Sequence, residues 1–252
     1  MIKQSMSCSF RIFCRLLFAS IFFLAPSLCS PALAVSQTVP AATITFDLDF
    51  PNSQPEHYSI ILKSDGGGRY QSSSRLPAAA LDSHDADSDA PDAKGAVSNN
   101  NDDFDLSFTV AAPTRQKIFD LAAKAGYFQK DVDSHHKGMA FTGKKTLGYK
   151  DAERSGESTY NYSSNAAVQE LTTLMQGIGA TLEFGHRLQY DLRYQKLALD
   201  EELKRMEEMS RSHQLVEVAA IQPVLDRIVA DSSVINVTRA RAQRLLQSEG
   251  GH

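Results

Sequence analysis

One segment, residues 112–128, constrains the fold most, because it reads as an amphipathic helix between two sets of strands. Pro113 suits the first turn of a helix, where its missing N–H has no partner to lose. Gly126 stands where a left-handed residue ends many helices. Between them, apolar residues recur at helical spacing: Ile118, Leu121, Ala122 and Ala125. The flanking segments alternate apolar and polar residues, as half-buried strands do. We therefore expect this helix to cover an antiparallel sheet.

The strands fall into two hairpin units. Before the helix, the alternation predicts strands over residues 43–50 and 58–63, from Arg69 onwards, and over 104–110, with a glycine-rich turn after Asp65. After the helix, residues 139–150 and 158–162 predict a second hairpin across a turn containing Gly156. The order β-β-β-β-α-β-β indicates an α+β fold, an antiparallel sheet from two hairpin units covered by one helix.

Residues 72–103 interrupt the strand pattern. They are rich in Ser, Ala, Asp and Asn and have almost no large apolar residue, which predicts a disordered acidic loop. Asp85, Asp87 and Asp89 resemble the start of a calcium-binding loop. Ala90 and Ala96, however, stand where such loops have Gly and Glu, so a solvated acidic loop is favoured over a calcium site.

The chain becomes helical in pattern after residue 163. Apolar residues seven apart predict a long helix over 166–209, and its glycines predict a break or kink in the first third. Two interpretations of the apolar stripe stay open, packing on the chain's own later helices and a dimeric coiled coil, with the first favoured. Residues 216–230, with a kink or restart at Pro223, and 237–247 predict a terminal helical hairpin. The stripe consists of Leu171, Ile178, Leu192, Leu199 and Met206. The glycines are Gly177, Gly179 and Gly185.

The first 34 residues are typical of a signal peptide. Three cations precede an apolar run over residues 16–28, and Ala32 and Ala34 suit a signal peptidase, so cleavage is expected after Ala34. The run is shorter than the roughly 20 residues of a spanning helix. We therefore expect a secreted or periplasmic protein with no membrane span after cleavage. The domain prediction is a signal peptide over 1–34, an α+β domain over 35–163 and a helical region over 164–252.

Cleavage changes the composition. It leaves 218 of the 252 residues, and the formal net charge goes from −4 to −7 because Lys3, Arg11 and Arg15 are removed. A mildly acidic chain argues against nucleic-acid binding, which requires a basic face. The cleaved chain has no thiol chemistry and no disulfide, since every cysteine lies within the signal: Cys8, Cys14 and Cys29.

Motifs with a defined catalytic role are absent from the sequence. It contains no Gly-x-Ser-x-Gly elbow, phosphate loop, dinucleotide fingerprint or His-Glu-x-x-His, so it predicts no cofactor and leans away from an enzyme. One set of potential metal ligands follows the central helix: Asp131, Asp133, His135 and His136. Against a metal site, neighbouring residues on a loop rarely converge on one ion. Glu183 and His186 have the Glu-x-x-His spacing, but di-iron bundles need two such helices.

A second set of residues suggests a binding face on the second hairpin. It combines lysines with tyrosines: Lys144, Lys145, Tyr149, Tyr160 and Tyr162. The alternative is that the tyrosines are core residues or cross-strand pairs, as aromatic residues on strands more often are.

Four runs of the sequence resemble a family of uncharacterised secreted bacterial proteins with a domain of unknown function. They are residues 57–62 (HYSIIL) with Asp65-Gly66, 117–122 (KIFDLA), 140–147 (AFTGKKTL) and 160–164 (YNYSS). The resemblance covers most of the chain after the signal, and it implies export. It implies no activity, ligand or functional residue. The segment 72–103 is longer than the pattern of the family requires.

Three functional hypotheses follow. The first is an exported, non-catalytic binding or interaction protein of the periplasm or cell envelope, whose partner is an unknown protein or envelope component. The second is a metal-assisted hydrolase that uses Asp131, Asp133, His135 and His136. The third is a self-assembling helical protein, a homodimer through the long helix.

Overall fold

The computed structural model describes residues 41–75 and 101–248. The expected signal peptide with its cleavage site lies outside the described residues. So does most of the expected acidic loop, with Asp85, Asp87 and Asp89.

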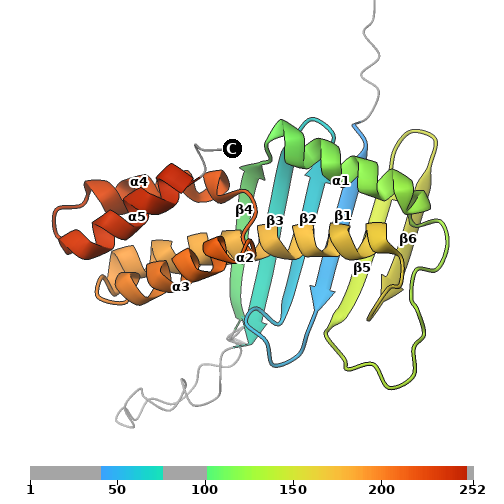
Figure 1. Cartoon of the computed structure of the whole chain (residues 1–252), viewed down its shortest axis with the longest axis horizontal. Coiled ribbons are helices and arrows are strands. Elements are labelled where there is room, and N and C mark those ends of the chain that lie inside the picture. The colour runs from blue at the N-terminus through green and yellow to red at the C-terminus, as the bar shows by residue number, and fades with distance from the viewer. Residues whose placement is uncertain (1–40, 76–100, 249–252) are drawn as a thin grey trace, which may run out of the picture. The chain divides into compact units, whose positions relative to one another are not determined.

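The sheet has six strands, and every neighbouring pair is antiparallel (Figure 1). Across the sheet the order is β4-β3-β2-β1-β5-β6. The bounds are β1 (Thr43–Asp49), β2 (His57–Lys63), β3 (Gly67–Arg75), β4 (Asn101–Thr109), β5 (Lys144–Lys150) and β6 (Ser155–Tyr160). Apolar and polar residues alternate along the strands, so the sheet has one apolar face and one polar face. In β1, Ile44 and Phe46 are buried beneath the helices, whereas Thr45 and Asp47 lie half-buried on the open face.

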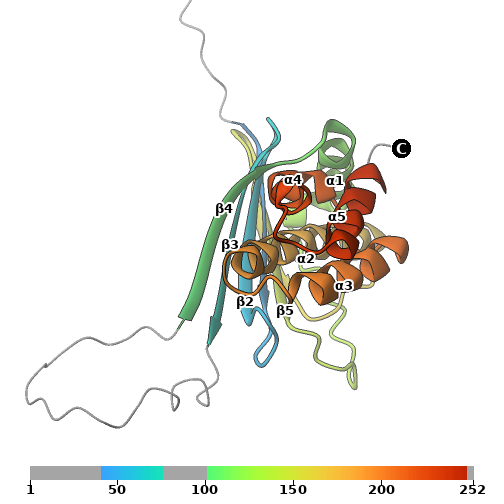
Figure 2. The same ribbon diagram turned by 90° about the vertical axis from the view of Figure 1, so that its left-hand side faces the viewer.

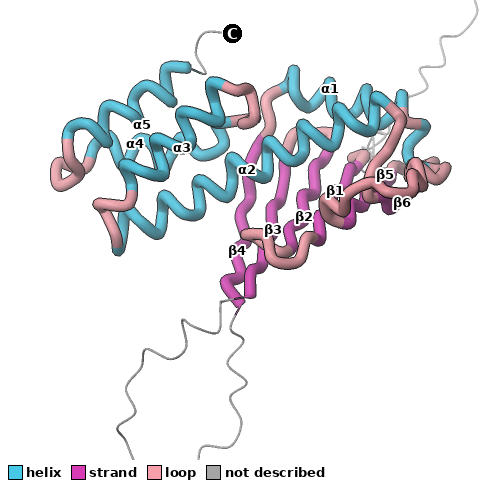
Figure 3. Tube along the Cα trace, turned by 60° about the horizontal axis from the view of Figure 1, so that its bottom comes forward, coloured by secondary structure: helices cyan, strands magenta, loops and turns pink. Residues whose placement is uncertain are grey.

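Two helices cover the other face of the sheet. In Figures 1 and 2, α1 (Ala112–Lys124) and α2 (Ala166–Tyr194) lie across the same side of the strands. Figure 3 shows α2 continuing past β4, where the remaining helices pack beside it. The shorter elements are η2 (Gly126–Phe128), α3 (Leu199–Arg211), η3 (Val218–Ile221), α4 (Gln222–Ala230) and α5 (Asn236–Ser248). The α+β prediction is confirmed, and α2 joins the expected helix as a second cover.

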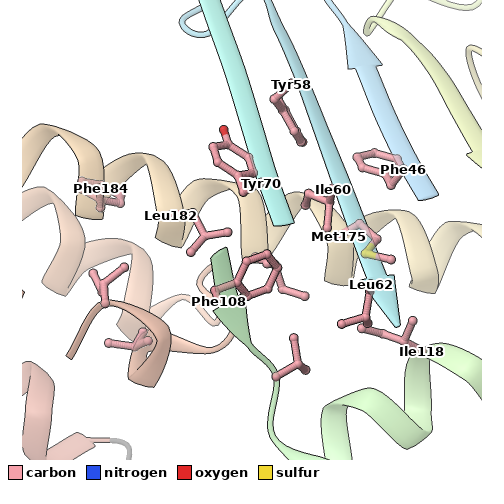
Figure 4. Packing of buried hydrophobic residues seen from close by; sticks show 14 of the residues in the cluster. Phe46, Tyr58, Ile60, Leu62, Tyr70, Phe108, Ile118, Met175, Leu182 and Phe184 are labelled. Carbon is pink, nitrogen blue, oxygen red and sulfur yellow. The ribbon is translucent and has the colours of Figure 1, made fainter. Parts of the chain in front are cut away.

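One hydrophobic core joins the sheet to the helices. Phe46 and Ile60 from the strands meet Ile118 of α1 and Met175 of α2, all fully buried (Figure 4). The stripe that runs along 166–209 packs inside the chain. Leu192 is half-buried against the core, and the other members are fully buried: Leu171, Ile178, Leu199 and Met206. This agrees with the favoured interpretation of intramolecular packing. Residues on both sides of the expected boundary at 163 share this core.

Several expected boundaries were wrong for the second hairpin. The first strand begins at Lys144 rather than 139, and Gly156 lies within β6 rather than in the turn. Asp151 makes the turn instead, because its carboxylate accepts hydrogen bonds from the N–H groups of Glu153 and Arg154. Gly156 has a packing role, since a Cβ there would overlap the backbone of Tyr127.

The expected kink of the long helix was also misplaced. The helix runs unbroken through its glycines and stops at Tyr194, before α3 starts at Leu199. Gly177 and Gly185 leave room for neighbours, because a Cβ at Gly185 would lie 2.5 Å from Cγ2 of Ile221. The predicted bounds of the acidic loop, 72–103, were also too wide, because residues 72–75 of β3 pair with residues 101–104 of β4. Over residues 41–75 and 101–248, no helix has both the length and the apolar character needed to cross a bilayer.

Candidate functional site

A buried carboxylate fastens α2 to the sheet. Oε1 of Glu183 accepts hydrogen bonds from the Tyr70 hydroxyl and the Ser72 hydroxyl, both on β3, at 2.6 Å each. Oε2 of Glu183 lies 3.9 Å from Nδ1 of His186 and 4.0 Å from an Arg187 nitrogen, and the Glu183 side chain is 12% exposed. Five polar groups thus converge between one helix and one strand.

The donors decide the charge of this cluster. Burial alone raises the pKa of Glu183, but hydrogen bonds from His186, Ser72 and Tyr70 outweigh it and hold that pKa below its usual value. Burial, together with the neighbouring Glu183 charge, raises the pKa of the Tyr70 hydroxyl. Glu183 is therefore a carboxylate at neutral pH, and Tyr70 stays a donor.

The arrangement does not match a nucleophilic triad. Such a site needs a base that accepts the proton of the nucleophile, with a carboxylate behind the base. Here the Ser72 hydroxyl donates directly to Glu183, which stands between Ser72 and His186. The cluster fixes geometry rather than activating a hydroxyl.

His186 continues the contact from β3 to β4. Its imidazole stacks on the ring of Phe104, with centroids 4.0 Å apart and planes at 8°. The helix therefore steps from Glu183 above β3 to His186 above β4 in three residues. That is about 4.5 Å at 1.5 Å per residue, close to the spacing of about 4.8 Å between strands.

Beyond β4, no strand of the described residues lies beneath the helix. From His186 to Tyr194, α2 extends eight further residues, or about 12 Å. We call residues 187–194 the overhang. Figures 1 and 3 show it beyond the edge of the sheet, with α3, α4 and α5 beside it.

The overhang and β4 enclose a groove of about 690 Å³, a volume in the range of ligand sites. We call it the edge groove. It is lined by Phe104, His186, Gln189, Tyr190, Leu192, Arg193, Tyr194, Arg227 and Asp231. Two of its side chains are exposed aromatics, Tyr190 at 51% and Tyr194 at 62%, with ring centroids 5.0 Å apart.

The edge groove carries positive charge that no carboxylate among the described residues neutralises. Within the described residues, no carboxylate lies at salt-bridge distance from Arg193 or Arg227. Asp231, the one acid in the lining, is engaged by Lys196 at 2.6 Å and by Ser233. The hydrogen bond from Lys196 holds the pKa of Asp231 well below its usual range. The Arg193 guanidinium lies over the Tyr194 ring, 5.3 Å from its centroid, and keeps its charge. A site with tyrosine walls and guanidinium groups that no described carboxylate neutralises suits a ligand that has apolar and acidic groups.

The loop with the expected metal ligands is brought together only in part. His135 Nε2 lies 2.7 Å from a carboxylate oxygen of Asp131, and its Nδ1 lies 3.7 Å from Asp133. The hydrogen bond to Asp131 raises the pKa of His135, which favours an imidazolium. His136 takes no part in these contacts, and no cluster of three or more ligands suited to a metal occurs in the part of the chain described. The side chains satisfy one another on an exposed loop.

The expected binding face on the second hairpin is not one surface. Tyr149, Tyr160 and Lys145 are buried on the helix side of the sheet, whereas Lys144 and Tyr162 are exposed. The Lys145 ammonium donates to the carbonyl oxygens of Thr142, Gly143 and Asn161, so it holds the preceding loop. Burial lowers the pKa of Lys145 and raises those of Tyr149 and Tyr160 to about 12.

Apart from His186, which was considered as half of a Glu-x-x-His pair, the residues of the edge groove were not selected from the sequence as functional residues. One signal was available, because Tyr190 and Tyr194 are four apart and lie off the apolar stripe. Large side chains on the polar side of an amphipathic helix indicate a second contact. The contributions of Phe104 and Arg227 had no local signal.

Comparisons with protein-family models, with curated proteins and with solved structures found no match for this chain. The resemblance to secreted bacterial proteins therefore stays an expectation.

Proposed function

We propose that the chain is an exported, non-catalytic binding protein of the periplasm or cell envelope, and that the edge groove holds its partner. The observation that carries the proposal is the pair of exposed tyrosines that line one groove with two arginines for which the described residues supply no ion-pair partner, next to the edge strand β4. The sequence of residues 1–34 supports export.

The side chains of the edge groove are of the kind that dominates binding surfaces. Tyr and Arg are enriched among residues whose removal costs the most binding energy, because each combines a large contact area with polar recognition. A tyrosine pair also loses little conformational entropy on binding. Tyr190 and Tyr194 are not part of the buried core, so the stability of the fold does not explain why large aromatic residues stand at these positions.

A display selection tests this proposal. Random twelve-residue peptides on phage are selected against the purified chain, and the selected peptides are measured against Tyr190→Ala/Tyr194→Ala. We expect the double variant to bind at least about tenfold more weakly, a loss of about 1.4 kcal/mol. Phe141→Ala is the matched control, since Phe141 is 57% exposed on another loop.

Two results would refute the assignment. One is a selection that enriches no peptide. The other is enrichment of peptides that bind the wild type and the double variant alike, or that depend equally on Phe141.

A further inference from the structure

We propose that the partner is an extended peptide segment that pairs with β4 as a seventh strand beneath the overhang. This rests on the proposed function, for which it names the class of ligand and the mode of binding. The argument has four parts, which concern the open edge, the space, the unfinished core and the charges.

The edge of the sheet at β4 is open. β4 pairs with β3 over nine residues, and no strand of the described chain pairs with its other side. Outward N–H and C=O groups of such a strand are a template for a further strand. On the open face of β4, Asp103 is exposed at the edge, whereas the Asp105 carboxylate is paired with Arg69 of β3, so the charge at this edge restricts the partner but does not block pairing.

The overhang leaves space for one strand at the correct height. Successive strands β3 and β4 lie under Glu183 and His186. The next position, about 4.8 Å farther on, falls under Gln189 and Tyr190, and both line the edge groove. The helix is already placed to cover a seventh strand as it covers β3 and β4.

The core is unfinished at this edge. Leu106 pairs with Tyr70, which pairs with Ile60, so the three side chains form one row on the covered face. Tyr70 and Ile60 are fully buried, whereas Leu106 and the adjacent Phe104 are only half-buried. An added strand would place a side chain beside Leu106 and complete the row.

Charge defines the pattern of the peptide. Side chains on its groove side would meet Tyr190, Arg193 and Arg227, so this side suits apolar residues with one acid. Side chains on its other side would lie beside Asp103 and beside Asp105, whose carboxylate already pairs with Arg69 of β3, so that side suits Lys next to Asp103 and Thr elsewhere. The ligand class is therefore a segment that alternates apolar or acidic residues with basic or hydroxyl residues.

A second copy of the chain fits this edge less well. Antiparallel pairing of two β4 strands keeps the helix layers of both copies on the same face of the joined sheet. The overhang, with α3, α4 and α5, extends past β4 on that face, so the helix layers of two copies would compete for the same space there (Figures 1 and 3). An isolated strand has no helix layer and avoids this overlap.

The probe is a labelled synthetic nonapeptide, TLKFTEKLT, in which Leu, Phe, Glu and Leu face the groove. Two N-methylated isomers carry methyl groups on the amides of one edge or of the other. N-methylation removes a backbone donor and leaves every side chain in place. Since only one edge of the peptide can pair with β4, we expect one isomer to lose at least about tenfold in affinity by fluorescence anisotropy, while the other binds like the parent.

The outcomes separate the two proposals. Strand addition is overturned if the parent peptide does not bind, or if both isomers bind equally. The proposed binding function still holds in that case if the peptides from the display selection depend on Tyr190 and Tyr194. A dimer in sedimentation that the peptide dissociates would place a second copy on the edge and also overturn the inference. The inference is supported if one isomer binds more weakly than the parent peptide and if the parent peptide itself binds Tyr190→Ala/Tyr194→Ala more weakly than the wild type.

Discussion

Replacing Glu183 tests the contact that sets the height of α2 above the sheet. In Glu183→Ala, the hydroxyls of Tyr70 and Ser72 lose their shared acceptor inside a largely buried site. A hydrogen bond to a charged group is worth about 1.5–3 kcal/mol net. Because the two donors share one oxygen and the Glu183 side chain keeps 12% exposure, we expect the free energy of unfolding to fall by about 2–4 kcal/mol in total.

Glu183→Gln separates charge from geometry. The amide keeps an oxygen that Tyr70 and Ser72 can reach, so only the charge assistance is lost and the expected cost is about 1 kcal/mol. The pKa of Glu183 is lower in the folded chain than its usual value, so the carboxylate stabilises the fold above the usual glutamate pKa. That contribution disappears as the pH falls through the folded-state pKa. The difference between wild type and Glu183→Gln should shrink in that window.

Urea unfolding followed by circular dichroism at several pH values measures both effects. Glu170→Ala is the matched control on the same helix, because Glu170 forms an exposed ion pair with Lys117 at 2.7 Å, worth about 0–1 kcal/mol. A Glu183→Ala variant within about 0.5 kcal/mol of wild type would refute the role of Glu183 as an anchor. A pH-independent cost of Glu183→Gln would refute the role of its charge.

Three further perturbations have defined outcomes. Gly185→Ala should lower the urea midpoint despite the better helix propensity, since overpacking against Ile221 costs about 1–3 kcal/mol, and Ile221→Ala in the double variant should show favourable coupling. Lys145→Met should lower the free energy of unfolding by about 1–3 kcal/mol, because the carbonyl oxygens that Lys145 binds would lose their donor, and it should speed hydrogen exchange over residues 139–143. Asp131→Asn should lower the raised pKa of His135 in an NMR titration; an unchanged pKa would show that Asp131 is not its cause.

Local patterns accounted for the fold class. Two patterns predicted it: the alternation along residues 43–50 and 104–110, and the helical spacing after Pro113. Both depend only on neighbouring residues, so they can be recognised without knowing how the rest of the chain folds. Boundaries failed where a single side chain or a contact decided them. Asp151 closed the hairpin turn, and glycines read as a kink instead made room for Val216 and Ile221.

The candidate site could be predicted only in fragments. The spacing of Glu183 and His186 drew attention to one helix turn, but their partners Tyr70, Ser72 and Phe104 are 82 to 113 residues away in sequence. No local pattern links residues at that separation. The metal-ligand and binding-face hypotheses relied on adjacency in sequence, and the fold turned several of those side chains toward one another or into the core.

The sequence by itself determined which residues are apolar on each strand and helix, because periods of 2 and 3.6 residues are set by backbone geometry alone. Only the tertiary structure decided that α2 crosses the sheet and runs on past β4. That outcome depends on the order of the strands and on the length of the helix together, and the edge groove exists because the helix is longer than the sheet is wide on that side.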